Sequence, residues 1–142
     1  MTNQIKIPIW FWIVSVVALL WNLMGLFAFY SDMTISQDAL AAMSADQRNL
    51  YETQPLWAKI AFGGAVILGV LGSIGLLMRK KWSTQVLLLS VAFVLAQMAH
   101  GFMSNSYEIM GSNALVMGVV VLVFALFLVW FSRHALVKGY LT

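Results

Sequence analysis

The segment WAKIAFGGAVILGVLGSIGLLMRKKW, residues 57–82, is a long apolar run that ends in the basic residues Arg79, Lys80 and Lys81. From Leu56 to Met78 the one charged residue is Lys59, near the start. A helix of this length spans roughly 30 Å at about 1.5 Å per residue, which matches the hydrocarbon core of a bilayer. The segment therefore predicts a transmembrane helix over residues 57–78.

Small residues recur at every fourth position of this helix. They are Ala61, Ala65, Gly69 and Ser73. A spacing of four places them on one side of a helix, here named the small-residue face, where another backbone can approach closely. We expect this face to be a helix-packing surface.

The composition excludes an ordinary soluble domain. The chain has 142 residues, of which 62% are hydrophobic and 9% are charged, and its mean hydropathy is +0.90. Soluble domains carry about 25% charged residues, so a membrane protein is the class that fits. Although the isoelectric point is near 9.5, the basic residues lie at the ends of apolar runs, so we expect the lipid bilayer and no nucleic acid as a partner.

Three further apolar runs predict spans at about residues 9–29, 83–102 and 114–131. The expected fold is an all-α integral membrane protein, a single domain over residues 1–142 built as a four-transmembrane-helix bundle. The fourth run has no polar side chain, so we expect it to be the most exposed to lipid.

The polar connection between the first two spans, residues 31–55, contains its own helical pattern. Ser44-Ala45-Asp46-Gln47 has the Ser-x-x-Gln form of a capping box, which predicts a short amphipathic helix from about Ala45 to Thr53. A further turn is expected at residues 37–42. These pieces cap the bundle, either as a surface helix against the ends of the spans or as a lid over a substrate.

The charged residues predict the orientation of the chain in the membrane. One side collects six basic residues: Lys6, Arg79, Lys80, Lys81, Arg133 and Lys138. The other side carries Arg48 and Lys59 together with all five acidic residues. By the positive-inside rule both termini face the cytoplasm of a bacterial inner membrane, and residues 31–55 lie outside.

Polar residues at membrane depth are candidates for ligand binding, because burying them in lipid is costly. They are Trp21, Asn22, Lys59, Gln97 and His100, all expected in the outer half, with Asp32, Tyr51 and Glu108 at the rim. Amides, an imidazole and an indole face would suit a small neutral hydroxylated solute.

Each of these residues also has a structural interpretation. Asn22, Gln97 and His100 would hydrogen-bond one another across helices and fix the bundle. Lys59 would extend to the interface or pair with Glu52 or Glu108. Trp21 would pack against the small-residue face.

The sequence gives no support for catalysis or a cofactor. His100 and His134 are expected on opposite sides of the membrane, so they cannot share a metal ion, and the chain has no cysteine. No pairing of a nucleophile with a base and no phosphate-binding glycine loop is present in the sequence. We expect no catalytic residue, no metal and no cofactor.

Several strings along the chain are similar to those of a known group. They are Leu20-Trp21-Asn22-Leu23-Met24-Gly25, Gln54-Pro55-Leu56-Trp57-Ala58, Arg79-Lys80-Lys81-Trp82, Gln97-Met98-Ala99-His100 and Leu128-Val129-Trp130-Phe131-Ser132. Nearly the whole chain resembles small bacterial four-span inner-membrane proteins that often carry the label "sugar transporter". The resemblance implies small-solute transport and transfers no binding residue. Lys59 departs from the small or neutral residue of the group.

Two functions are therefore expected. The first is a non-catalytic helix bundle that binds a partner protein or lipid, or associates with itself through the small-residue face. The alternative is a carrier of a small, sugar-like solute, which would have to act as an oligomer because four packed helices leave little space for a solute path.

Overall fold

The structure of the protein is a computed structural model, and it describes residues 5–142. The helices in this range are α1 (Ile9–Met33), α2 (Gln37–Ala41), α3 (Ala45–Glu52), α4 (Leu56–Leu77), α5 (Trp82–Met103), α6 (Ser106–Met110) and α7 (Ser112–Val137). Four of them, α1, α4, α5 and α7, are long and apolar enough to cross a membrane. The predicted all-α, four-span membrane bundle is confirmed, with α1 and α7 longer than expected.

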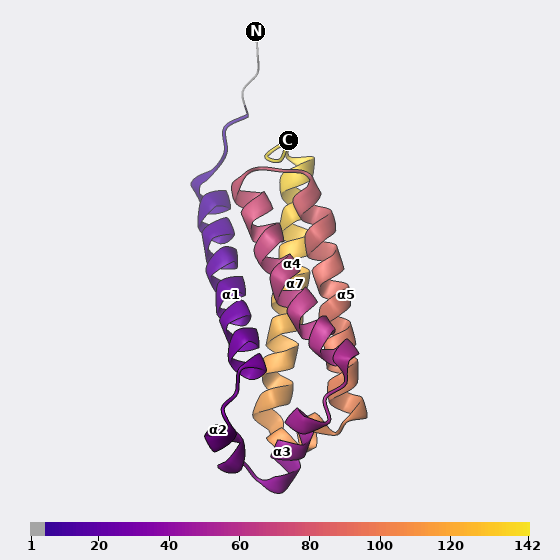
Figure 1. The fold of residues 1–142 in the computed structure, drawn as a ribbon. Coiled ribbons are helices and arrows are strands. Elements are labelled where there is room, and N and C mark those ends of the chain that lie inside the picture. The colour runs from indigo at the N-terminus through magenta and orange to yellow at the C-terminus, as the bar shows by residue number, and fades with distance from the viewer. Residues whose placement is uncertain (1–4) are drawn as a thin grey trace.

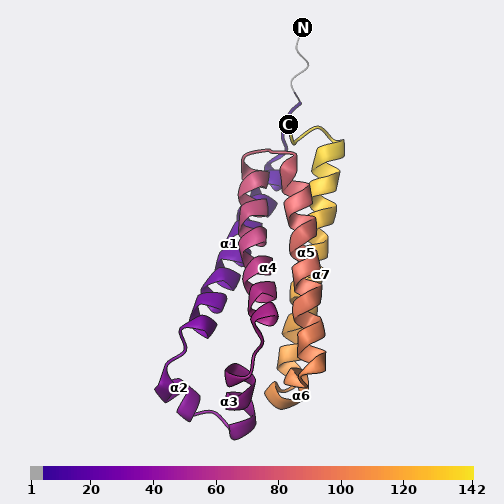
Figure 2. The ribbon, with the colours of Figure 1, turned by 45° about the vertical axis from the view of Figure 1, so that its right-hand side comes forward.

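Helix α4 lies at the centre of the bundle (Figures 1 and 2). It packs against α1 on one side and α5 on the other, and α5 packs in turn against α7. Of the four spans α4 is the most buried and α7 the least, as expected for a span without polar side chains. Helix α7, the most lipid-exposed span, is therefore the last in the series of contacts that runs from α1 through α4 and α5.

The small-residue face of α4 lies inside this bundle. Ala61, Ala65, Gly69 and Ser73 are all buried. A methyl group placed on Gly69 would lie 2.8 Å from Cγ of Asn22 in α1, so the two helices are in close contact here. Because its own chain covers this face, it offers no free surface for a second copy of the protein.

The two ends of the bundle differ in content. The start of α1, the α4–α5 turn and the C-terminus lie at one end, and α2, α3 and α6 lie at the other (Figure 1). The first end is called the basic end here, because the α4–α5 turn contains Arg79, Lys80 and Lys81. The second is called the loop end.

Helices α4 and α7 end in the same hydrogen-bonded turn. After α4, Arg79 has φ 57° and the Lys80 amide donates to the Gly75 carbonyl at 2.8 Å. After α7, Gly139 has φ 80° and the Tyr140 amide donates to Ala135 at 2.8 Å. This is the Schellman pattern, in which the left-handed residue is usually glycine.

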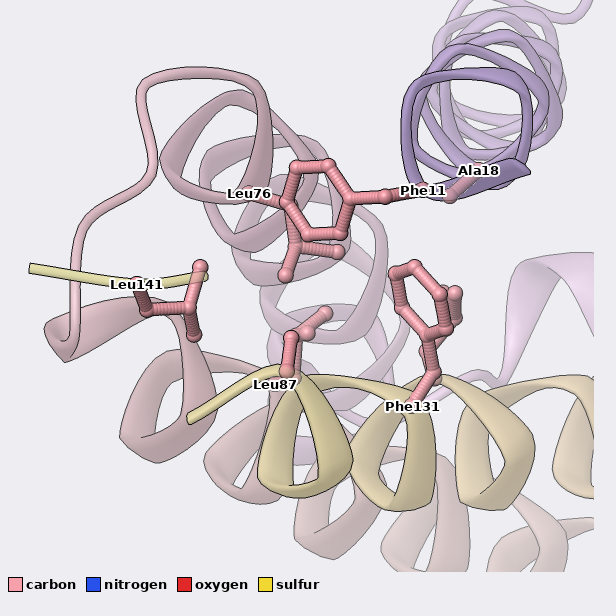
Figure 3. Close-up of a cluster of buried hydrophobic side chains, with 8 residues drawn as sticks. Phe11, Ala18, Leu76, Leu87, Phe131 and Leu141 are labelled. Carbon is pink, nitrogen blue, oxygen red and sulfur yellow. The ribbon is translucent and has the colours of Figure 1, made fainter. Parts of the chain in front are cut away.

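The hydrophobic core is concentrated near the basic end. It consists of Phe11, Ala18, Leu76, Leu87, Leu128, Phe131, Ala135 and Leu141. Phe11 of α1 and Phe131 of α7 stack with ring centroids 5.6 Å apart, and Leu141 of the C-terminal tail is part of the cluster (Figure 3). The four spans are thus joined tightly at this end.

The loop between α1 and α4 folds into α2 and α3, as predicted. The Ser44 hydroxyl accepts a hydrogen bond from the Gln47 amide at 3.2 Å, which is the predicted cap of α3. Arg48 of α3 donates to the carbonyls of Leu40 and Met43 at 3.1 and 3.3 Å. The guanidinium therefore satisfies carbonyls at and after the end of α2 and joins the two short helices.

Candidate functional site

A cavity of about 430 Å³ lies between the spans, in the half of the bundle toward α6. Its walls come from α1, α4, α5 and α7, and Tyr107 lines it from α6 at the loop end. Most of the lining is apolar: Met24, Gly25, Ala28, Phe62, Ala65, Val66, Leu87, Val94, Met98, Ala114, Met117, Gly118, Val121, Phe124, Ala125 and Leu128. A volume of this size is typical of a site for one small ligand.

Toward the basic end of the bundle, the cavity is closed by the hydrophobic core. Leu87 and Leu128 line the cavity and also belong to the core cluster, with exposed fractions of 2% each. Closer to the basic end, Phe11 and Phe131 fill the space between α1 and α7. Any occupant is therefore confined to the loop-end half of the bundle.

The side of the cavity between α1 and α7 is open. Met24 of α1 and Met117 of α7 both line it, yet they are 67% and 57% exposed. Figure 2 shows α1 leaning away from α7 toward the loop end. In a bilayer this opening faces the acyl chains, so the cavity is continuous with the hydrocarbon of the membrane.

Asn22 lies in the cavity wall, and its amide is already bonded to protein. Its Nδ2 donates to the Ala18 carbonyl at 2.8 Å and to the Ser73 hydroxyl at 3.1 Å. The Ser73 hydroxyl donates to the Gly69 carbonyl at 2.8 Å. Asn22 thus joins α1 to the small-residue face of α4, and its partners are not the expected Gln97 and His100.

Ser90 of α5 forms a second polar link between spans. Its hydroxyl donates to the Ala65 carbonyl of α4 at 2.8 Å. Ala65 is a member of the small-residue face, and the absence of a large side chain there lets Ser90 reach the backbone. Ser90 also lines the cavity, but its hydrogen is used within the bundle.

Gln97 and Tyr107 are two lining residues whose side-chain polar groups remain free. Within residues 5–142, neither the Gln97 amide nor the Tyr107 hydroxyl has a hydrogen-bond partner. Burial raises the pKa of Tyr107, so this phenol is protonated at neutral pH and can donate a hydrogen bond. Both groups are therefore available to an occupant of the cavity.

Tyr107 reaches the cavity because Gly101 leaves room for its ring, and the ring lies in ordinary contact with Gly118. A methyl group on Gly101 of α5 would lie 2.7 Å from the Tyr107 hydroxyl oxygen, and one on Gly118 of α7 would lie 3.4 Å from it. The ring also packs edge-on against Phe102 with centroids 4.9 Å apart. Tyr107 is thus wedged between α5 and α7.

Trp21 contacts a different helix from the one expected. Its indole stacks on Phe124 of α7, with centroids 4.9 Å apart and planes at 28°. The position predicted for it, against the small-residue face of α4, is taken by Asn22. Together Trp21 and Phe124 form the cavity wall where α1 and α7 meet.

The structure does not bring Lys59 and His100 to the cavity. Neither residue lines it, and both are half-buried. His100 packs edge-on against Trp57 of α4, with ring centroids 5.3 Å apart. Of the five predicted ligand-binding residues, the cavity therefore includes Trp21, Asn22 and Gln97.

The residues expected at the rim also lie away from the cavity lining. Asp32, Tyr51 and Glu108 do not contribute to it. Burial, and then the nearby Asp32 carboxylate, raise the pKa of Tyr51, so the side chain of Tyr51 lies close to Asp32 near the end of α1. This contact positions the loop, and Tyr107 takes the place expected for the rim residues.

Sequence reasoning missed Tyr107 as a site residue. It lies in a short loop helix, where an isolated tyrosine is typical of an interfacial aromatic. The available signal was Gly101, which follows Gln97 by four residues and so shares its face of α5. A glycine on the same face as a membrane amide indicates that another side chain enters there.

Comparison with known proteins gives no further guidance, because no protein-family model, curated protein or solved structure matches this chain.

Proposed function

We propose that the protein is a non-catalytic multi-pass membrane protein that binds an apolar, bilayer-resident molecule in the cavity between its spans. The observation that carries this proposal is the apolar lining together with the opening between Met24 and Met117. A molecule dissolved in the membrane can reach such a site sideways without crossing water. Its apolar part would replace acyl chains against the lining.

The chemistry of the lining favours a lipid-like occupant over a sugar. Every hydroxyl of a sugar needs a hydrogen-bond partner when it is buried, and an unmade bond costs about 1–3 kcal/mol. The polar groups of the described lining residues that make no hydrogen bond to protein are the Gln97 amide, the Tyr107 hydroxyl, the Trp21 indole N–H and the Asn22 amide oxygen, which are few beside the hydroxyls of a sugar. The sugar transport that the sequence resemblance implies would therefore need polar groups from outside this cavity.

The same lining supports a non-catalytic role. Within residues 5–142, no Asp, Glu, His, Lys or Arg lines the cavity. Proton transfer in enzymes most often uses these side chains, with Tyr and Cys less common. Tyr107 is protonated at neutral pH and lacks a neighbouring base in the lining, which supports a binding role for it.

The proposed location is a bacterial inner membrane, with the basic end in the cytoplasm. Arg79, Lys80 and Lys81 lie at the same end of the bundle as the start of α1 and the C-terminus (Figure 1). The positive-inside rule then places both termini in the cytoplasm and the loop end outside. The cavity would open into the outer leaflet.

The proposal is tested by filling the cavity. Ala125→Phe adds an aromatic ring to the lining of α7, and Ala92→Phe adds the same ring to an exposed site on α5. The new ring takes space that an occupant would fill, and each loss of about 1.4 kcal/mol in binding free energy lowers the affinity about tenfold. Native mass spectrometry of protein purified in mild detergent measures co-purified lipid.

We expect the wild type and Ala92→Phe to retain a bound lipid-like molecule and Ala125→Phe to lose it. Thermal unfolding of each variant checks that it remains folded. Equal retention by the two variants would contradict the proposal. So would uptake of radiolabelled glucose into proteoliposomes at a rate that Ala125→Phe abolishes.

A further inference from the structure

The outer end of the cavity carries a pair of polar groups that the fold leaves unbonded. Gln97 lies one helical turn before Gly101 on α5, and the Tyr107 hydroxyl lies against Gly101. The amide and the hydroxyl therefore face the same end of the cavity. At this depth an unbonded amide costs free energy, so an occupant that bonds it is favoured.

The absence of ionised side chains from the described lining determines which charge an occupant can carry. Among the described residues that form the cavity there is no ionised side chain. An ionised head group without a counter-charge is strongly disfavoured in such surroundings. Gln97 can donate and accept hydrogen bonds, and the Tyr107 hydroxyl can do both as well, which suits a neutral hydroxyl or carbonyl.

The direction of the occupant follows from the two ends of the cavity. Leu87 and Leu128 close the inner end with apolar side chains, while Gln97 and Tyr107 lie toward the outer end. A polar head would thus be held near α6. The apolar body would lie along the lining and leave through the opening between Met24 and Met117.

We infer that the cavity selects a neutral amphiphile, with its hydroxyl or carbonyl head bonded by Gln97 and Tyr107 and its apolar body passing between α1 and α7 into the bilayer. This inference rests on the proposed function and adds the charge, the orientation and the recognising residues of the ligand. An anionic lipid of the same length should be a poor ligand.

The test compares two photoreactive probes of the same chain length, hexadecanol and hexadecanoate. The full-length protein is reconstituted in liposomes at pH about 9, because the bilayer raises the pKa of a fatty carboxyl group above its ordinary value of about 4 and the probe must stay ionised. After illumination, mass spectrometry of the peptides locates the labelled residues. Labelling of lipid-facing residues outside the cavity gives the background for each probe.

Matched variants identify the groups that hold the head. Gln97→Leu removes the cavity amide, and Gln85→Leu removes an exposed amide from the same helix. Tyr107→Phe removes the tyrosine hydroxyl of the cavity, and Tyr30→Phe removes a tyrosine hydroxyl that is exposed. Loss of a single hydrogen bond should lower cavity labelling by hexadecanol about fivefold in the Gln97 and Tyr107 variants, with the two controls unchanged.

Stronger cavity labelling by hexadecanol than by hexadecanoate, lowered by Gln97→Leu and Tyr107→Phe, is the expected result. Equal labelling by both probes, or equal labelling of Gln97→Leu and Gln85→Leu, would overturn the inference while leaving a lipid-binding cavity in place. Absence of cavity labelling above background by either probe, with lipid retention unaffected by Ala125→Phe, would overturn the proposed function as well.

Discussion

Asn22 shows how a single polar residue joins two membrane helices. Its amide nitrogen donates to Ala18 in its own helix and to Ser73 across the contact, and its oxygen lies directly against Gly69. Hydrogen bonds of this kind contribute about 0.6 to 2 kcal/mol in membrane proteins. The contact depends on Gly69, because any larger residue would occupy the space of the amide.

Gly69→Ala should destabilise the bundle. The added methyl group would overlap the Asn22 side chain, which can move only by giving up its bonds to Ala18 and Ser73, at about 1–2 kcal/mol. Thermal unfolding in detergent measures the change. Gly118→Ala is the matched control, since its methyl group would lie 3.4 Å from the nearest atom, an ordinary contact.

A double-mutant cycle tests the cause of this effect. In an Asn22→Ala background the obstacle to the new methyl group is gone, so Gly69→Ala should cost little there. Equal stability of Gly69→Ala and Gly118→Ala would contradict the close contact between α1 and α4. So would an equal loss of stability on Gly69→Ala with and without the Asn22 side chain.

At the scale of elements, the C-terminal tail behaves as a part of the core. The Arg79 guanidinium donates to the Tyr140 carbonyl at 2.8 Å, and the Thr142 amide donates to the Arg79 carbonyl at 2.6 Å. These bonds tie the tail to the α4–α5 turn. They also help to hold Arg79 in a left-handed conformation that costs a non-glycine residue about 1–2 kcal/mol.

Leu141→Ala should therefore destabilise the protein by about 2–5 kcal/mol, because Leu141 is 2% exposed and fills the core beneath this turn. Leu126→Ala removes the same atoms from a side chain of α7 that is 51% exposed, and it should change stability by less than about 0.5 kcal/mol. Thermal unfolding in detergent compares the two. Equal stability of both variants would mean that the tail is not packed in the core.

For the whole molecule, the two ends of the bundle are expected on opposite sides of the membrane. The α4–α5 turn and the C-terminal tail are bonded to each other, so they must lie on the same side of the bilayer. Helices α2 and α3 lie at the opposite end (Figure 2). With six of the eight basic residues assigned to the first side, that side is expected in the cytoplasm.

Single-cysteine variants test this orientation directly, because the chain has no cysteine of its own. Ala42→Cys, at the end of α2, should react in intact cells with a maleimide that cannot cross membranes. Lys80→Cys, in the α4–α5 turn, should react only after the cells are opened. Labelling of Lys80→Cys from outside would reverse the proposed orientation and place the cavity in the inner leaflet.

Part of the site could be predicted from the sequence, because polar residues at membrane depth are conspicuous. Trp21, Asn22 and Gln97 were expected to line one pocket, and all three line the cavity. Lys59 and His100 were expected with them and lie elsewhere, since depth along a helix does not determine which side of it faces the interior. Tyr107 was missed because its position depends on Gly101, which lies on another helix.

The sequence by itself determined the four apolar spans, the two short helices of the first loop and the cap at Ser44. These features depend on hydropathy and on hydrogen bonds between residues close in the chain, which are local quantities. The tertiary structure alone decided that Asn22 bonds Ser73, that Leu141 enters the core and that a cavity remains between α1 and α7. Each of these depends on which faces of separate helices meet. Lipid and a neighbouring helix are nearly equal as apolar surroundings, so close packing between helices determines which faces meet.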